Sequence, residues 1–74
     1  MTQFFFDIAS SEFVQHDFQG RHYAKAEEAY ELARLIALDL SFTEESADKE
    51  VHVRNAAGDR LFIARVGNLD LMAA

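Results

Sequence analysis

The residues of this sequence best suited to chemistry are two histidines and an aspartate that lie close together. His16, Asp17 and His22 combine two imidazoles with a carboxylate, a set that can bind zinc or another divalent cation and leave a fourth position open. Their spacing matches no standard metal-binding motif, and adjacent residues of a strand point to opposite faces. The competing interpretation is three surface residues, with Asp17 supporting a turn at Gly20. Metal or ligand binding therefore stays an alternative function, and no cofactor is predicted.

A second pair of reactive side chains lies on a later strand. His52 and Arg54 alternate with Val51 and Val53, so a general base and an anion-binding guanidinium share one face. The ordinary interpretation of this pattern is the solvent-facing side of a strand. The sequence shows no Ser-His-Asp arrangement, glycine-rich phosphate loop or close carboxylate pair in different environments. We therefore predict no catalytic residues and expect a non-enzymatic protein.

The composition excludes several classes of function. The chain has 74 residues, no cysteine and a net charge of −6; nucleic acids and anionic membranes are bound mainly by basic surfaces, so neither is an expected partner. No apolar run could span a bilayer and no signal peptide is visible, which favours a cytoplasmic location. Disulfides and thiolate zinc sites are impossible without cysteine. For so short a chain, association with another chain is then the most open source of added stability.

The hydrophobic pattern predicts an α+β domain that spans residues 1–74. A strand is expected at residues 3–9, a second at 12–18, a helix from about 24 to 41, and two more strands at 50–55 and 60–66 with a turn at Gly58. Two β-hairpins joined by one helix (β-β-α-β-β) most simply form an antiparallel sheet with the helix on one face. Strand order stays open. Residues 43–49 are expected to form a solvated loop, and the tail 67–74 either frays or packs back.

These elements resemble a known family. The resemblance is carried by the aromatic strand at residues 4–8, the segment Asp17-Phe18-Gln19-Gly20, the alanine-spaced helix and the hairpin segment 51–58. The chain resembles a family of short proteins, common in rhizobia and related alphaproteobacteria, that is catalogued as a domain of unknown function. The resemblance covers residues 4 to 66. It implies the same fold, and brings no established activity, cofactor or catalytic residue.

The predicted helix has two apolar sides. One side carries apolar residues at spacings of three and four, and its small alanines allow close approach to a sheet: Ala26, Ala29, Ala33, Ile36, Ala37 and Leu40. The opposite side carries Leu35, Leu38 and Phe42. A helix that covers a sheet with one face does not need three large apolar groups on its back.

The predicted sheet carries a similar apolar surplus. Phe5 on the first strand and Phe62 on the last are expected to project away from their strand neighbours, as is Val66. One helix covers only one face of such a sheet, and contiguous exposed apolar patches usually mark interfaces. The competing interpretation is that the tail 67–74 folds back over one patch and the other apolar residues are scattered singly.

The leading hypothesis is a cytoplasmic protein that self-associates as a symmetric homodimer. The predicted interface residues are Leu35, Leu38 and Phe42, with Phe5 and Phe62 as a second candidate patch. Two alternatives stay open. The chain could be an acidic inhibitor or adaptor that binds one larger protein through the same patches, or a metal- or ligand-binding protein that uses the histidine and aspartate cluster.

Overall fold

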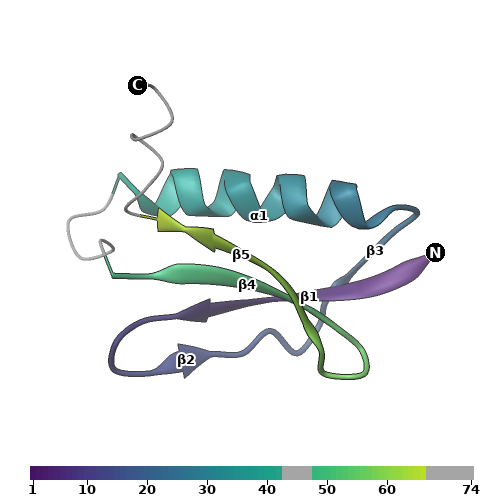
Figure 1. Ribbon diagram of the computed structural model, residues 1–74, viewed down its shortest axis with the longest axis horizontal. Helices are drawn as coiled ribbons and strands as arrows, with labels where there is room; N and C mark the ends of the chain where they lie inside the picture. Colours follow the sequence, from purple (N-terminus) through teal and green to yellow (C-terminus); the bar gives the residue numbers. More distant parts are fainter. Residues whose placement is uncertain (43–47, 67–74) are drawn as a thin grey trace.

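The computed structural model describes residues 1–42 and 48–66 and shows one helix packed on one face of an antiparallel sheet (Figure 1). The expected loop at 43–49 lies mostly, and the expected tail at 67–74 wholly, outside the described residues. The elements in chain order are β1 (Thr2–Ala9), β2 (Val14–Gln15), β3 (Arg21–Tyr23), α1 (Ala26–Leu40), β4 (Glu50–Asn55) and β5 (Arg60–Arg65). The predicted α+β class, with its helix on one face, is confirmed.

The strand β1 is central to the sheet. It pairs along its length with β4, and β4 pairs with β5, while β2 and β3 both pair with the other side of β1. The order across the sheet is β2-β1-β4-β5 with β3 beside β1. The two hairpins predicted from the sequence are therefore joined through their first strands, β1 and β4.

The predicted second strand at residues 12–18 is wrong in its extent. Within this range the structure forms only the short strand β2, and a further strand that was not predicted, β3, follows a turn around Asp17 and Gly20. Gly20 has a φ of 70°, a backbone conformation that non-glycine residues rarely adopt. The turn interrupts pairing with β1, so the predicted strand ends early and pairing resumes only at β3.

The helix α1 begins without a conventional capping residue. Lys25 is extended, and its backbone N–H donates to Glu28 Oε1 at 3.0 Å, so a glutamate three residues on satisfies a group that would otherwise lack a partner. At the other end the Ser41 N–H donates to the Ala37 carbonyl at 3.0 Å. The helix is thus anchored at both ends, two residues later than predicted at its start and one residue earlier at its finish.

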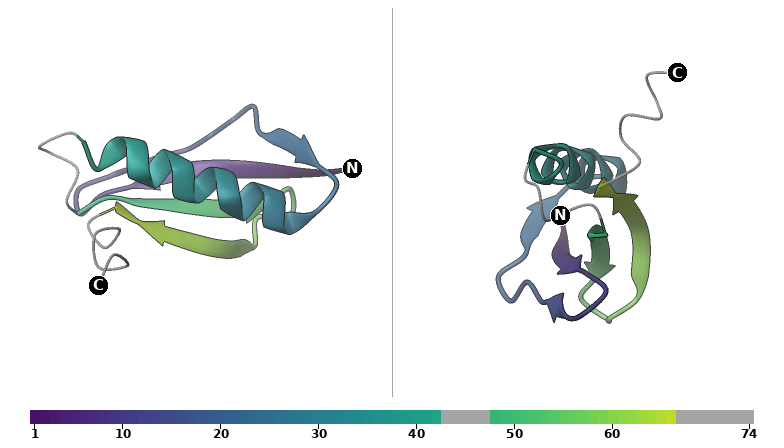
Figure 2. Two further views of the ribbon diagram at one scale, coloured as in Figure 1. Left: turned by 90° about the horizontal axis from the view of Figure 1, so that it is seen from above. Right: turned by 90° about the vertical axis from the view of Figure 1, so that its left-hand side faces the viewer.

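The core lies between α1 and the sheet. The buried face of α1 consists of Ala29, Ala33 and Ala37, as its periodicity predicts. These small side chains let the helix axis run close above the strands, as the end-on view in Figure 2 shows. The sheet contributes Phe4, Phe6, Val51, Val53, Ala64 and Val66 to the same core.

The last strand faces the core with the side that was predicted to point away from it. Phe62 packs against the core and Val66 is buried, whereas Leu61 and Ile63 are exposed. The strand is apolar on both sides, so alternation alone cannot choose the buried one. The pairing decides it, because Phe62 lies opposite the buried Val53. The prediction that Phe62 and Val66 form surplus apolar surface is therefore wrong.

Candidate functional site

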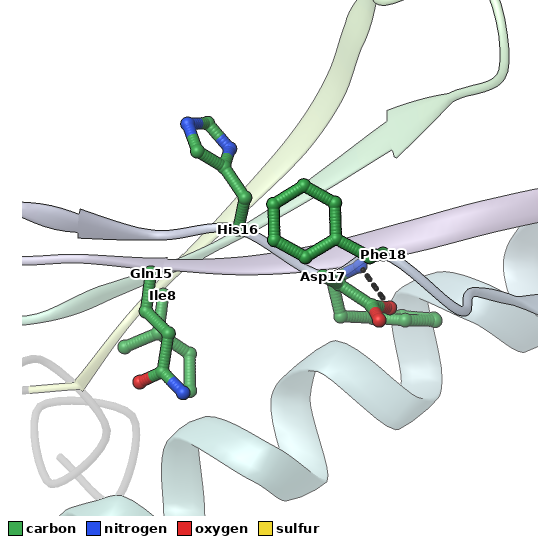
Figure 3. Close-up of a pocket in the computed structure, with 6 residues that line it drawn as sticks. Ile8, Gln15, His16, Asp17 and Phe18 are labelled. Carbon is green, nitrogen blue, oxygen red and sulfur yellow. Dashed lines mark hydrogen bonds between the residues drawn. The ribbon is translucent and has the colours of Figure 1, made fainter.

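Between β2 and β3, where strand pairing is interrupted, the Asp17 carboxylate accepts a hydrogen bond from the edge of β1. Its Oδ2 accepts the Phe6 N–H at 3.1 Å, and its Oδ1 accepts the N–H groups of Gln19 at 3.0 Å and Gly20 at 3.2 Å. The bond to Phe6 is the dashed line in Figure 3. The expectation that Asp17 supports a turn at Gly20 is confirmed. Both carboxylate oxygens are occupied by this task.

The three sequence-predicted ligands do not converge. His16 points away from the sheet, while the Asp17 carboxylate turns back toward β1, as Figure 3 shows. His22 lies on β3 opposite Gln3. Among residues 1–42 and 48–66, no group of three or more His, Cys, Asp or Glu side chains could hold a metal ion. The metal alternative gains no support from this geometry.

A hollow of about 200 Å³ lies beside these residues. Phe6 and Ile8 of β1 line it, together with Gln15, His16, Asp17 and Phe18 from the neighbouring segment. Figure 3 shows Ile8 and Gln15 on the side toward α1. The acidic group at the hollow is Asp17, whose oxygens already accept three backbone N–H groups. The Asp17 carboxylate is therefore already engaged, and the other polar side chains at the hollow are Gln15 and His16.

A buried ion pair joins β1 and β4 on the face away from α1. Asp7 has a side chain only 6% exposed, and its Oδ2 accepts Arg54 Nε–H at 2.8 Å. A second guanidinium nitrogen donates to Asp7 Oδ1 at 3.2 Å and to the Asp17 carbonyl at 3.2 Å. The guanidinium also lies over the Phe5 ring, 4.6 Å from its centroid. Arg54 thus ties β1, β4 and the turn after β2 together.

The pKa values of both carboxyl groups in this cluster are lowered. Burial raises the pKa of Asp7, but the Arg54 hydrogen bond, the Asp17 amide and the positive charge of Arg54 bring that pKa below its ordinary value. Burial likewise raises the pKa of Asp17, but the hydrogen bonds from the three backbone N–H groups outweigh this effect, so its pKa also lies below the ordinary value. Both groups are stabilised as carboxylates, which suits structural anchors rather than proton donors.

Both side chains of the predicted outward pair on β4 contact carboxylates. His52 Nε2 lies 2.8 Å from Glu50 Oε1, and Arg54 is held by Asp7 as described. The second oxygen of Glu50 lies 3.2 Å from Arg65 Nε. The alternation of β4 is confirmed, since Val51 and Val53 are buried. The side chains of His52 and Arg54 are held by neighbouring carboxylates rather than aimed at a common point.

The outward face of α1 carries the largest predicted patch. Leu35 is 56% exposed, Leu38 45% and Phe42 80%; we call these three residues the helix patch. The spacing of three residues places Leu35 and Leu38 on the side of α1 opposite Ala29, Ala33 and Ala37, and Phe42 follows just after the C-cap Ser41. Within residues 1–42 and 48–66 no other element covers these side chains.

The second predicted patch does not exist as one surface. Phe5 lies on the face away from α1 beneath Arg54, whereas Phe62 stacks on Tyr30 of α1 with ring centroids 4.6 Å apart. Their grouping is therefore wrong, because each ring is partly covered on a different side of the sheet. Sequence reasoning passed over other exposed apolar side chains, at Phe13, Val14 and Phe18 near β2 and at Leu61 and Ile63 on β5.

The comparisons with known proteins identify a family but no activity. A family model described as "Domain of unknown function (DUF6894)" matches residues 3–67, so the chain belongs to this family. No curated protein and no solved structure matches it. The predicted membership of a family of unknown function is thus confirmed. In the part of the chain that the structure describes, no helix is long and apolar enough to cross a membrane.

Proposed function

We propose that this member of the DUF6894 family is a non-enzymatic, cytoplasmic protein–protein interaction domain that self-associates as a symmetric dimer through the outward face of α1. The observation that carries the proposal is the exposure of Leu35 and Leu38 on a helix whose other side already fills the core, together with the exposure of Phe42 just after its end. Soluble proteins rarely leave large contiguous apolar groups in water without a partner. The polar clusters support the proposal indirectly, since their charged groups are used to hold the fold.

Charge along α1 favours an antiparallel arrangement of the two helices. The helix patch lies in the C-terminal half of α1 and just after it, a part with one acidic residue, Asp39, while Glu27, Glu28 and Glu31 lie in the N-terminal half. A parallel pair would bring like charges together, which is unfavourable. An antiparallel crossing near Leu38 lets the two patches meet and carries each acidic half past the partner's C-terminal end. A two-fold axis at this point makes the interface self-complementary.

The size of the helix patch determines how strongly we expect the two copies to bind each other. Three large side chains per copy are far fewer than the roughly 20 residues a side of a standard stable interface. We therefore expect a dissociation constant of about 10–100 µM. Light scattering coupled to size-exclusion chromatography, over loading concentrations from about 10 to about 500 µM, measures the mass directly. A monomer at every concentration contradicts the proposal.

A pair of double variants separates the helix patch from other exposed apolar groups. Leu35→Gln with Leu38→Gln is expected to abolish dimer formation while circular dichroism shows unchanged helix content. The matched control is Leu61→Thr with Ile63→Thr, which removes two exposed apolar side chains, 39% and 37% exposed, from β5. This control is expected to dimerise like the unaltered chain. If only the control variant fails to dimerise, the interface lies on the sheet at β5 and not on α1.

The alternative of an acidic inhibitor or adaptor uses the same helix patch. It differs in predicting a monomer in isolation and a defined complex with one larger protein. The net charge of −6 favours a basic partner surface around the apolar contact. Cross-linking from a cysteine placed at Phe42, followed by identification of the linked chain, distinguishes the two: a second copy supports the dimer, and one recurrent larger protein supports the adaptor.

A further inference from the structure

The strand β5 forms one edge of the sheet. It is the last strand in the order, and in the described part of the chain no strand pairs with its outer side. Val66 N–H donates to the Lys49 carbonyl at 3.1 Å, and Asn55 N–H donates to the Asp59 carbonyl at 3.0 Å. Backbone groups of an antiparallel strand point alternately to its two neighbours, and the β4–β5 register shifts between Val53 and Arg54. The two bonds therefore fix the directions of the backbone groups separately on each side of this shift.

The backbone groups of three residues therefore face outward from β5. Val66 is bonded toward β4, and Glu50 pairs with Arg65, so the alternation directs the N–H and C=O groups of Ile63 and Arg65 to the outer edge. The same argument from Asn55 and Asp59 directs those of Arg60 outward. The register shift separates Arg60 from the other two residues, so the regular template for an added strand consists of Ile63 and Arg65.

The side chains along this edge are basic and apolar. Arg60 and Arg65 lie at the two ends of β5 with Leu61 and Ile63, both exposed, between them. The strand contains no acidic residue, although acidic residues outnumber basic ones by 13 to 7 in the chain. On the side of α1, the Arg34 guanidinium lies 5.0 Å from the Phe62 ring centroid, but its charge is paired with Glu31 at 3.1 Å.

The two arginines of the strand differ in their partners. Arg65 pairs with Glu50 at 3.2 Å but keeps its side chain 63% exposed. For Arg60, no carboxylate among residues 1–42 and 48–66 lies within ion-pair distance. Within the described part of the chain, the charge of Arg60 is thus unpaired, and it can attract an acidic group from outside.

We propose that the β5 edge binds an extended, acidic segment of another protein, which adds to the sheet as an antiparallel strand. Main-chain hydrogen bonds at Ile63 and Arg65 hold the added segment, and acidic side chains at its ends pair with Arg60 and Arg65. A second copy of β5 is a poorer occupant, because antiparallel pairing would collect the arginines of both copies in one seam. The same arginines thus guard the edge against self-pairing.

This inference does not rest on the proposed dimer. The helix patch lies on the outward side of α1, while the β5 edge lies at the margin of the sheet beneath it (Figure 2). An antiparallel pair of helices leaves both β5 edges accessible. A dimer would present two strand-binding edges, and a monomer would present one.

The test uses the full chain and a designed peptide. The probe is a ten-residue, end-capped peptide that alternates valine with glutamate, and the control probe has lysine in place of every glutamate. Nuclear magnetic resonance of the amides reports the site. We expect the glutamate peptide to slow hydrogen exchange at Ile63 and Arg65 by about tenfold or more, and the lysine peptide to leave it unchanged. A glutamate peptide N-methylated on alternate residues is expected not to bind.

Charge reversal on the protein completes the test. Arg60→Glu is expected to weaken the glutamate peptide by about tenfold and to favour the lysine peptide instead. The matched control is Arg21→Glu, which makes the same charge change on β3 at the opposite side of the sheet, where Arg21 is also exposed. This control is expected to bind the glutamate peptide like the unaltered chain.

Several results would overturn the proposal. Equal binding of the glutamate and lysine peptides would show that charge does not select the partner. Unimpaired binding of the N-methylated peptide would show that backbone hydrogen bonds do not hold it. Amide changes centred on the helix patch would show that the peptide binds there, on the surface of the proposed dimer interface, and not at β5. Protection of Ile63 and Arg65 that grows with protein concentration, without peptide, would make the occupant a second copy. Absence of binding at about 1 mM peptide would also overturn it.

Discussion

At the scale of residues, the charged side chains that look most reactive in the sequence are structural. Asp17 holds a turn against β1, and Asp7 and Arg54 hold β1 to β4. A buried charge is costly unless it is paired and hydrogen-bonded, and the oxygens of both carboxylates accept hydrogen bonds. The chemistry of this cluster is therefore that of a clamp between segments far apart in the sequence.

The clamp predicts a large effect of removing its cation. Arg54→Met leaves the Asp7 carboxylate, 6% exposed, without its ion-pair partner. Removing one member of a buried pair destabilises proteins by about 3–5 kcal/mol; because the Arg54 side chain is 25% exposed, we expect the lower end, about 3 kcal/mol. Urea denaturation followed by circular dichroism measures it. Arg34→Met, which breaks an exposed pair with Glu31, is expected to cost no more than about 1 kcal/mol; equal costs would refute the clamp.

The same cluster predicts how acid affects stability. The folded-state pKa of Asp17 is lowered, after burial raises it, by the three backbone N–H groups that its carboxylate accepts. A lowered folded-state pKa gives stability that is fully present above the unfolded value of about 3.9 and is lost as the pH falls through the folded-state pKa. Asp17→Asn is expected to cost about 2 kcal/mol at pH 7, because an amide has one acceptor oxygen where the carboxylate has two.

The pH profile distinguishes this electrostatic origin from simple loss of packing. The difference in unfolding free energy between the unaltered chain and Asp17→Asn is expected to shrink as the pH falls below about 4, because the carboxylate of the unaltered chain becomes protonated. Urea denaturation at several pH values between 2 and 7 measures it. A difference that stays constant with pH would show that Asp17 stabilises the turn without its charge.

At the scale of elements, two turns contain a glycine with a left-handed backbone. The turn between β2 and β3 depends on Gly20 more strongly than the β4–β5 hairpin depends on Gly58. Both Gly20 and Gly58 have positive φ, at 70° and 96°. A Cβ at Gly20 would lie 2.9 Å from the Phe4 carbonyl oxygen and 3.0 Å from the Phe5 ring, whereas one at Gly58 meets nothing within 4 Å.

The two glycines therefore form a matched pair for substitution. Gly58→Ala is expected to cost about 1 kcal/mol, the penalty of a left-handed backbone for alanine. Gly20→Ala carries the same penalty and also crowds the backbone of β1, so we expect about 2–3 kcal/mol. Thermal and urea denaturation of both variants measure the difference. Equal costs would show that β1 moves away without penalty.

Local patterns in the sequence were sufficient for some elements. Spacings of three and four located α1 and its buried alanines, and strict alternation located β4 with Val51 and Val53 inward. These patterns work because the period of the side chains reports directly on which side is buried. The turn glycine of the second hairpin was also predicted, since an Ala-Ala-Gly-Asp segment between two strands needs a positive φ.

Other features depend on contacts that no local pattern contains. The interruption between β2 and β3 follows from the Asp17 carboxylate reaching the Phe6 N–H, a bond between residues 11 positions apart. The buried side of β5 follows from its pairing with β4, because its sequence is apolar on both faces. The Asp7–Arg54 pair joins residues 47 positions apart. Each required the tertiary fold, which is why the clamp was not anticipated.

At the scale of the whole molecule, the core consists mostly of small side chains. Of the buried core residues that the structure describes, four are alanines and three are valines, with Phe4 and Phe6 as the large ones. A domain of 74 residues buries a modest fraction of its surface, so little stability comes from this core. The helix patch and the β5 edge are the surfaces at which association could add to it.

Coupling between association and stability gives the last prediction. A partner that binds only the folded chain raises its stability in proportion to the logarithm of concentration, so the thermal midpoint of a dimer rises with protein concentration. With a dissociation constant of about 10–100 µM, raising the chain from about 10 to about 500 µM is expected to add roughly 1–2 kcal/mol, or several degrees for a domain of this size.

The double variant of the helix patch shows whether that rise belongs to α1. Leu35→Gln with Leu38→Gln is expected to have a midpoint independent of concentration, and at low concentration to match the unaltered chain within about 2 °C, because both side chains are exposed in the monomer. Differential scanning calorimetry at both concentrations measures this. If the variant is as concentration-dependent as the unaltered chain, self-association uses another surface; if neither depends on concentration, the exposed apolar side of α1 has no second copy as its partner.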